Sequence, residues 1–389
     1  MANNLSPKYA SPPVIAAIQR HGRVLVIGAG SSGLAAAAEL QRRGVRAEIL
    51  ERSDTVGSAW QTRYDRLRFN TCRWNSTLSH EPFPKGTPLF LLPDDFTRYL
   101  GSYAETNRLS VEFGVEVKRV ERYNGEWQLI TSAGERTADH VIIATGLMHT
   151  PRYPDWPGLD LYSGCLLHSA DYRNAEPFRN ADVLVVGAGS SAMDIAADLA
   201  RGQAGRIRLA VRSQPNLMQR APFGLPGDLL TTALFRLQPQ HADTIHRILR
   251  RITIGNLAER GLTVPAEGSF TRARRTGSGP TVVDKAVLQT IKSRRVEIVA
   301  AVSSVHADGV RLADDSTVSP DVIIAATGFT PGLTEVVGHL GVLDDRGVPL
   351  VSGGPPALPG LRFSGFVANI RSQYKDALRV AEQVTQELG

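Results

Sequence analysis

The chain has 389 residues, of which 42% are hydrophobic and 21% charged, and its formal net charge is +6. This length exceeds what one hydrophobic core usually serves, so we expect two domains, and the ordinary composition excludes a disordered or fibrous protein. The basic residues are scattered and accompany no recognised nucleic-acid motif, so we expect no nucleic acid partner; anionic cofactors account for the surplus equally well.

The start of the chain resembles neither a secretion signal nor a membrane anchor. Residues 1–20 contain no apolar segment after a basic start, and we expect a short arm there. No later segment is apolar and uncharged over the about 18 residues that a membrane helix needs, so we expect no stable membrane insertion. Only Cys72 and Cys165 are present, far apart in sequence, which is typical of a cytoplasmic protein and leaves no pair for dithiol chemistry.

Two segments of the chain are near copies of each other. They read VLVIGAGSSGLAAAAEL from Val24 to Leu40 and VLVVGAGSSAMDIAADL from Val183 to Leu199. Each combines an apolar run, a glycine turn and an alanine-rich helix. The runs lack the alternation of a half-exposed strand, as expected for central parallel strands covered by helices on both faces. We therefore predict an α/β fold with two Rossmann-like dinucleotide-binding domains.

The first copy carries Gly28, Gly30 and Gly33 in the pattern G-x-G-x-x-G. These glycines allow, in order, a tight turn, close approach of a pyrophosphate, and packing of the helix on the strand. The start of the helix then favours the phosphates. Glu51 ends the next predicted strand, 46–51, where a carboxylate accepts hydrogen bonds from ribose hydroxyls and repels a 2′-phosphate. This site is predicted to bind FAD or NAD rather than NADP.

The second copy carries the variant G-x-G-x-x-A, formed by Gly187, Gly189 and Ala192. The strand that follows ends at Arg212, whose guanidinium can hold a phosphate through two hydrogen bonds. We therefore predict that this site binds NADPH, and that hydride passes from its nicotinamide to FAD at the first site. In the alternative interpretation, Glu51 and Arg212 are solvated strand-end residues.

Two matching phrases, VIIATG and VIIAATG, end at Gly146 and Gly328, and prolines follow both. We expect the chain to cross between domains at these points. This predicts an FAD-binding domain of residues 21–150 and 327–389, into which an NADPH-binding domain of residues 151–326 is inserted.

The stretch of about 215–280 departs from both copies. It is helix-prone between Leu229 and Arg251, and from Gly268 onward it is rich in Gly, Arg and Thr. We interpret it as a helical decoration with a solvated basic loop; a lid and a site of peripheral membrane contact are alternatives. The predicted loop contains Arg272, Arg274 and Arg275.

Between the two copies, the segment YSGCLLHSADY resembles the motif F-x-G-x-x-x-H-x-x-x-[YFW] that identifies class B flavin monooxygenases. Tyr162, Gly164, His168 and Tyr172 carry the match, with Tyr in place of the usual Phe. The order of the two glycine turns around this motif is typical of that family, and the resemblance covers nearly the whole chain from Arg23. The phrases WQTRYDRLRFNT, VRSQPNLMQR and TVVDKAVL look similar to the YUCCA-type plant enzymes, which oxidatively decarboxylate an α-keto acid.

The resemblance implies an NADPH-dependent monooxygenase. NADPH would reduce FAD, O2 would add at flavin C4a, and one oxygen atom would enter a small organic substrate. It favours attack at a carbonyl carbon; oxygenation of nitrogen or sulfur is the alternative, since the motif ends in tyrosine as in the heteroatom-oxygenating branches. A flavin reductase that serves a quinone or a protein, and a catalytically idle NADP-binding protein, are further alternatives. A homodimer is compatible with the sequence.

The resemblance also implies residues close to the chemistry. Asn75, in the phrase WNS, is the candidate to hold the oxygenated flavin, with Asn70 or a plain turn asparagine as alternatives. His168 is expected to couple NADP binding to catalysis from the linker between the domains, or else to be satisfied by backbone hydrogen bonds. Tyr172 closes the same motif.

Near the C-terminus, residues 361–366 are predicted to form a strand that returns to the flavin domain, followed by a helix from about Tyr374. Gly365 and Asn369 are expected near the isoalloxazine ring. No metal site is expected. The other expected cofactor-binding residues are Ser32, Arg52, Trp60, Gly146, Ser190, Ser191 and Gly328.

Overall fold

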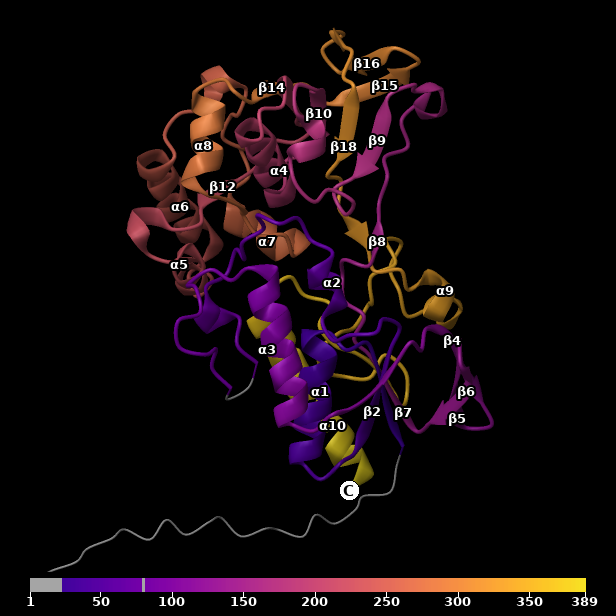
Figure 1. The fold of residues 1–389 in the computed structure, drawn as a ribbon. Helices are drawn as coiled ribbons and strands as arrows, with labels where there is room; N and C mark the ends of the chain where they lie inside the picture. The colour runs from indigo at the N-terminus through magenta and orange to yellow at the C-terminus, as the bar shows by residue number, and fades with distance from the viewer. Residues whose placement is uncertain (1–22, 79–80) are drawn as a thin grey trace, which may run out of the picture.

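The structure, a computed structural model, describes residues 23–78 and 81–389, so the predicted arm of residues 1–20 lies outside the described residues. Two lobes, each built on a five-stranded parallel sheet, lie one above the other in Figure 1. No helix in the described ranges is both long and apolar enough to cross a bilayer.

The sheet of the first lobe joins strands from both ends of the chain. Its order is β20 (Leu361–Phe363), β7 (His140–Ile143), β1 (Val24–Ile27), β2 (Ala47–Glu51) and β3 (Ser110–Phe113), and all neighbours are parallel. Alternate residues of β1 face opposite sides, and both sides are buried. This explains why its sequence is an unbroken apolar run.

Different elements cover the two faces of this sheet. Helices α1 (Ser31–Arg42), α3 (Pro93–Thr106) and α10 (Ile370–Leu388) share one core with Val24 and Val26. Leu25 and Ile27 pack with an antiparallel sheet on the other face. That sheet consists of β4 (Val117–Tyr123), β5 (Glu126–Thr131) and β6 (Gly134–Ala138).

The second lobe repeats this architecture. Its parallel sheet has the order β14 (Glu297–Val299), β11 (Arg206–Ala210), β10 (Asp182–Val186), β18 (Val322–Ala325) and β9 (Cys165–His168). Helices α4 (Ser190–Arg201) and α8 (Lys285–Lys292) pack on one face. The strands β15 (Val302–His306), β16 (Gly309–Leu312) and β17 (Thr317–Val318) lie over the other. The predicted pair of Rossmann-like folds is confirmed.

The two chain crossings between the lobes lie side by side. β8 (Thr150–Pro151) follows the first parallel sheet and pairs antiparallel with β19 (Phe329–Thr330), which follows the second. In Figure 1, β8 lies between the lobes. We propose this paired segment as the boundary between an FAD-binding and an NADPH-binding domain.

The segment between β11 and β14 forms the helical decoration. It contains α5 (Gly227–Leu234) and α6 (Pro239–Thr253), separated at Pro239, and the paired strands β12 (Leu217–Gln219) and β13 (Thr281–Val283). Shorter elements, of which η4 and η5 also belong to this segment, complete the described chain. They are α2 (Ser58–Gln61), α9 (Thr334–Val337), η1 (Arg73–Asn75), η2 (Leu159–Leu161), η3 (Glu176–Phe178), η4 (Pro222–Gly224), η5 (Ala258–Arg260) and η6 (Gly338–Leu340).

Two local predictions are wrong for the same reason. The expected basic loop contains the helix α7 (Ser269–Thr276), because the carboxylate of Asp243 in α6 accepts hydrogen bonds from the backbone of Phe270 at 2.6 Å and Thr271 at 3.2 Å. The last helix begins at Ile370 rather than Tyr374, because the Asn369 side chain accepts from Ser372 N at 2.8 Å. In both cases a capping side chain sets the helix start.

Candidate active site

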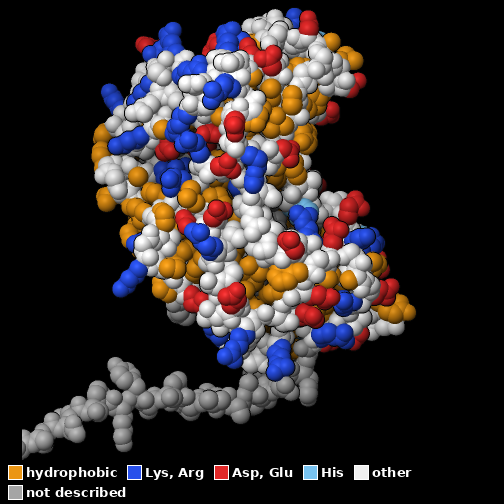
Figure 2. All heavy atoms as spheres, in the orientation of Figure 1, with side chains coloured by type: hydrophobic (Ala, Val, Ile, Leu, Met, Phe, Trp, Pro, Cys, Tyr) orange, Lys and Arg blue, Asp and Glu red, His pale blue; other side chains and the backbone are white. Residues whose placement is uncertain are grey.

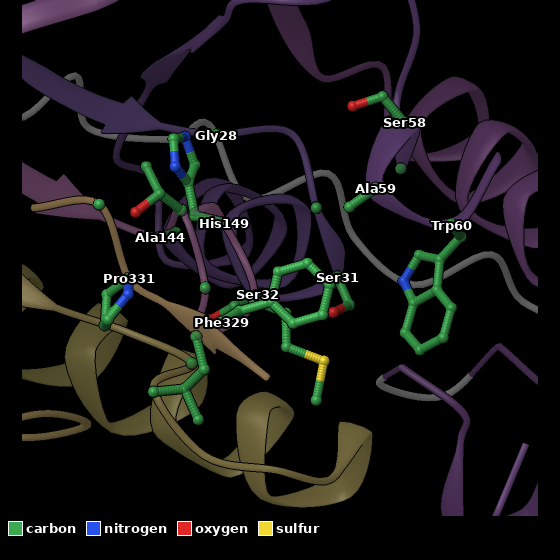
Figure 3. Close-up of a pocket in the computed structure, with 18 of the residues that line it drawn as sticks. Gly28, Ser31, Ser32, Ser58, Ala59, Trp60, Ala144, His149, Phe329 and Pro331 are labelled. Carbon is green, nitrogen blue, oxygen red and sulfur yellow. The ribbon is translucent and has the colours of Figure 1, made fainter. Parts of the chain in front are cut away.

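A cavity of about 970 Å³ lies between the lobes and is lined by both glycine turns. Gly30 and Ser32 contribute from the first turn, and Gly189 and Ser191 from the second. Figure 3 shows Ser31 and Ser32 near its centre, with Trp60 on one side and Pro331 on the other. Because the starts of α1 and α4 open into the same space, two anions bound at these helix ends would be neighbours.

The first turn has the geometry that a pyrophosphate needs. Gly28 adopts a φ of +104°, and a Cβ on Gly33 would overlap the Gly28 carbonyl oxygen. A Cβ on Gly30, by contrast, would have no neighbour within 4 Å, so the backbone there faces open space. No side chain caps α1. The turn therefore offers free helix-start amides to an anion, as FAD requires.

The second turn matches the first in these respects. Gly187 has a φ of +143°, and a Cβ on it would lie 2.5 Å from the carbonyl oxygen of Ala326. The backbone at Gly189 faces open space, and α4 has no side-chain cap. The Ser190 hydroxyl accepts a hydrogen bond from Val282 N in β13 at 3.1 Å, so the decoration supports this turn. Ala192 is fully buried on α4.

The residues expected at the two strand ends, Glu51 and Arg212, lie in different environments. Glu51 lines the cavity, and its carboxylate accepts hydrogen bonds from Ala29 N at 2.7 Å and from the hydroxyl of Ser53 at 2.8 Å. The carboxylate oxygens of Glu51 have further lone pairs, which can accept hydrogen bonds from ribose hydroxyls. β11 ends at Ala210, two residues before the predicted strand end at Arg212. Arg212 is exposed and makes no hydrogen bond or ion pair with any described residue. Its guanidinium is therefore available to a phosphate.

His168 and Tyr172, the two residues of the flavin-monooxygenase motif that were expected close to the chemistry, lie outside the cavity lining. His168 is buried; its Nδ1 accepts from Ala170 N at 3.1 Å, so Nε2 carries the proton and donates to the Gly328 carbonyl at 3.0 Å. Burial lowers the pKa of His168 and favours this neutral form. A direct contact of His168 with reacting atoms does not fit this geometry. The bond to Gly328 does fit a role in the linker.

Tyr172 donates to a carboxylate that contacts the first lobe. Its buried hydroxyl donates to Asp198 in α4 at 2.8 Å, and the same carboxylate pairs with Arg66 of the first lobe at 2.8 Å. Burial of the phenol, together with this carboxylate, raises the pKa of Tyr172. Tyr172 therefore supports the carboxylate that pairs with the first lobe, and a catalytic contact by this side chain does not fit.

The two candidate asparagines occupy different environments. Asn75 is buried outside the cavity lining; it donates to Asp228 of α5 at 2.6 Å and accepts from Arg371 of α10 at 2.9 Å. In this structure these partners hold the amide of Asn75 away from the cavity lining, and a flavin contact by Asn75 stays a prediction. Asn70, the alternative, lines the cavity, and its amide has no hydrogen-bond partner among the described residues.

The remaining predicted cofactor residues come together at the cavity. The Ser32 hydroxyl lies 2.8 Å from that of Ser364, and Gly365 packs so closely on Ser32 that a Cβ there would overlap it. Arg52 lies 2.7 Å from the ring of His149. All the residues in this group line the cavity: Ser32, Arg52, Trp60, Gly146, Ser190, Ser191, Gly328, Gly365 and Asn369.

The sequence did not reveal a second set of cavity residues. Asp194 of α4 accepts from the Tyr64 hydroxyl at 3.0 Å and lies 3.5 Å from Arg220 of the decoration. Burial raises the pKa of Asp194 to about 6. Asp194 occupies the position of Ala35 in the first copy. A carboxylate where the other copy has alanine was the signal in the sequence that could have identified Asp194.

The raised pKa of Asp194 makes a pH-dependent prediction. The native state binds this proton more readily than the unfolded chain, so the contribution of Asp194 to stability is lost as pH rises from its ordinary pKa of 3.8 through about 6. Asp194→Asn keeps an acceptor for Tyr64 and carries no buried charge. We expect its melting temperature relative to wild type to rise between pH 5 and pH 7, with the exposed Asp345→Asn as control. If Asp194→Asn and wild type differ in melting temperature by the same amount at pH 5 and pH 7, the raised pKa of Asp194 is contradicted.

Comparisons with known proteins agree with this geometry. The profile of the pyridine nucleotide-disulphide oxidoreductase family matches residues 25–222. Indole-3-pyruvate monooxygenase YUCCA1 of Oryza sativa subsp. japonica is 36% identical over 310 residues, which span 78% of this chain and 76% of that protein.

Solved structures share the fold. The flavin-containing monooxygenase from Stenotrophomonas maltophilia aligns with a TM-score of 0.74 at 24% identity, covering 95% of this chain and 99% of that one. S-allyl-L-cysteine S-oxygenase from Allium sativum aligns with a TM-score of 0.65 at 21% identity, covering 94% of this chain and 79% of that one. At these identities, the structural likeness establishes the architecture of both lobes.

Proposed function

Because the chain belongs to the class B flavin-dependent monooxygenases, which use FAD and NADPH, we propose that it oxygenates the carbonyl carbon of an aromatic 2-oxo acid. The name of the rice relative, indole-3-pyruvate monooxygenase, supports this substrate class. The proposed net reaction converts a 2-oxo acid, O2, NADPH and a proton into a carboxylic acid shorter by one carbon, CO2, NADP⁺ and water.

One observation carries the choice of an acidic aromatic substrate: an unpaired cation lies beside aromatic rings in the cavity. The Arg63 guanidinium lies over the Phe329 ring, 5.0 Å from its centroid, and makes no ion pair with a described carboxylate. Burial lowers the pKa of Arg63. Trp60 and Phe69 stack with centroids 4.4 Å apart in the same lining. A carboxylate on an aromatic body would pair with Arg63 and pack on these rings.

The chain's own residues would position the reactants. The start of α1 and Glu51 would hold the pyrophosphate and ribose of FAD, while the start of α4 and Arg212 would hold NADPH. When bound, FAD accepts hydride from NADPH and activates O2. Asn70 would donate a hydrogen bond to the oxygen atom on which charge develops, and the aromatic lining would exclude water.

The test is a product analysis of the FAD-loaded protein under ¹⁸O2. With NADPH and phenylpyruvate, we expect phenylacetate carrying one ¹⁸O atom and release of one CO2 per NADPH oxidised. Sulfoxide from methyl phenyl sulfide without phenylacetate would support the heteroatom alternative instead. NADPH oxidation that yields only stoichiometric peroxide with either compound would contradict the proposal and favour a reductase.

Asn70 is expected to matter for chemistry and not for folding. Removing a donor that stabilises developing charge typically costs about 10²–10³ in rate, so Asn70→Ala should lower product formation by about 100-fold. NADPH oxidation and the melting temperature should stay near wild type, because the Asn70 amide has no partner among the described residues. The comparison is Asn75→Ala, which should lower the melting temperature by removing both hydrogen bonds of a buried amide. The opposite pattern would return the role to Asn75.

A further inference from the structure

Helix α6 buries charged side chains and exposes large apolar ones, the reverse of an ordinary surface helix. Its buried face carries Asp243, His246 and Arg250. Its outer face carries Ile245, Ile248 and Ile252, which are 37%, 56% and 64% exposed. The spacing i, i+3, i+7 places the three isoleucines on one stripe of the helix. A stripe that ordinarily packs into a core thus faces away from the protein.

The exposed stripe belongs to a larger apolar area. Of the seventeen large hydrophobic side chains exposed among the described residues, nine lie between residues 223 and 264. Figure 2 shows hydrophobic side chains over α5 and α6 at the left of the molecule, with Lys and Arg side chains beside them. We call this area the α5–α6 surface and define it by Leu229, Phe235, Leu237, Ile245, Ile248 and Ile252.

The segment that carries this surface also carries most of the net charge. Residues 215–280 contain nine arginines, four carboxylates and no lysine, which leaves a net charge of +5 out of the +6 of the whole chain. Three of the carboxylates make internal contacts, since Asp243 caps α7, Asp228 accepts from Asn75, and Glu267 pairs with Arg275. Arg236, Arg247 and Arg251 are exposed around the apolar side chains. The surroundings of the α5–α6 surface are therefore strongly basic.

We propose that the α5–α6 surface binds the surface of an anionic lipid bilayer. Apolar side chains with flanking arginines combine the two contributions that hold an amphipathic helix in the headgroup region: burial of the apolar stripe and attraction to acidic lipids. A second copy of this chain fits less well, because a twofold dimer through this surface would bring two segments of charge +5 face to face. The positive charge of this surface therefore favours an anionic lipid over a second copy of the chain.

The test is co-sedimentation of the FAD-loaded, full-length protein with vesicles of phosphatidylcholine alone or mixed equally with phosphatidylglycerol. We expect binding to the mixed vesicles that weakens as salt rises. The variant I245S/I248S/I252S should bind at least tenfold more weakly. Leu161→Ser, which removes a side chain 60% exposed in the second lobe at η2, is the matched control and should bind like wild type.

Several outcomes would overturn the proposal. They are an absence of binding to the mixed vesicles, binding that is indifferent to lipid charge, or a triple variant that binds as tightly as wild type. Dimerisation in solution that the triple variant abolishes would assign the α5–α6 surface to a second copy instead. Unchanged NADPH oxidation by the triple variant shows that it is folded, so lost binding is then due to the surface.

Discussion

Arg212→Ala is expected to lower kcat/KM for NADPH by about 100-fold and to leave kcat/KM for NADH nearly unchanged. Two charge-assisted hydrogen bonds to a 2′-phosphate at about 1.5 kcal/mol each account for a change of this size. The structure leaves the guanidinium exposed and without a partner among the described residues, so no internal contact is broken by the substitution. Steady-state kinetics with both nucleotides gives the ratio directly.

The matched control for Arg212 lies at the start of the strand that precedes it. Arg206 is also exposed, but it begins β11 and pairs with Glu297 at 2.9 Å. Arg206→Ala should change kcat/KM for both nucleotides equally and by a small factor. If Arg212→Ala impairs NADH and NADPH alike, or if the two variants behave the same, Arg212 is not the residue that recognises the 2′-phosphate.

Gly33→Ala is expected to yield protein that purifies with less than a tenth of the wild-type flavin content. The added methyl group would overlap the carbonyl oxygen of Gly28, which is backbone in the turn itself and has no free rotation. Such overpacking typically costs about 1–3 kcal/mol or more, and relief requires α1 to move away from the strand. That movement displaces the helix-start amides from the pyrophosphate position.

The control for Gly33 is a glycine in a helix with free space around it. Gly101 lies within α3, and a Cβ on it would meet nothing within 4 Å. Gly101→Ala should retain full flavin content and gain slight stability, since alanine is the better helix former. The absorbance ratio of flavin to protein, with the melting temperature, measures both variants. Normal flavin content in Gly33→Ala would show that this close approach is not needed.

The sequence alone determined the architecture and the character of the two nucleotide sites. Both depend on local patterns: an apolar run, a glycine turn and an alanine-rich helix within about 17 residues, as the Rossmann fingerprint requires. The steric demands at Gly28 and Gly33 arise within one turn. Glu51 is likewise located by strand length and order, whereas β11 ends two residues before Arg212. Short-range geometry of this kind can be predicted from the sequence without knowing which other elements pack against it.

Only the tertiary structure decided which polar side chains reach the cavity. Asn70 and Asn75 are five residues apart, yet only Asn70 lines it, because Asp228 and Arg371 hold the amide of Asn75 elsewhere. These partners are 153 and 296 residues away in sequence. Such contacts depend on how distant helices pack, and no local spacing records them.

The same reason explains the other differences. The helix α7 exists because a carboxylate 27 residues earlier caps it, and Arg63 meets Phe329 only where the two chain crossings bring the lobes together. Helix α6 reads as an ordinary amphipathic helix in sequence, and only its packing shows that the isoleucines face outward. A hydrophobic pattern specifies that a helix has two faces, whereas the neighbouring elements determine which face is buried.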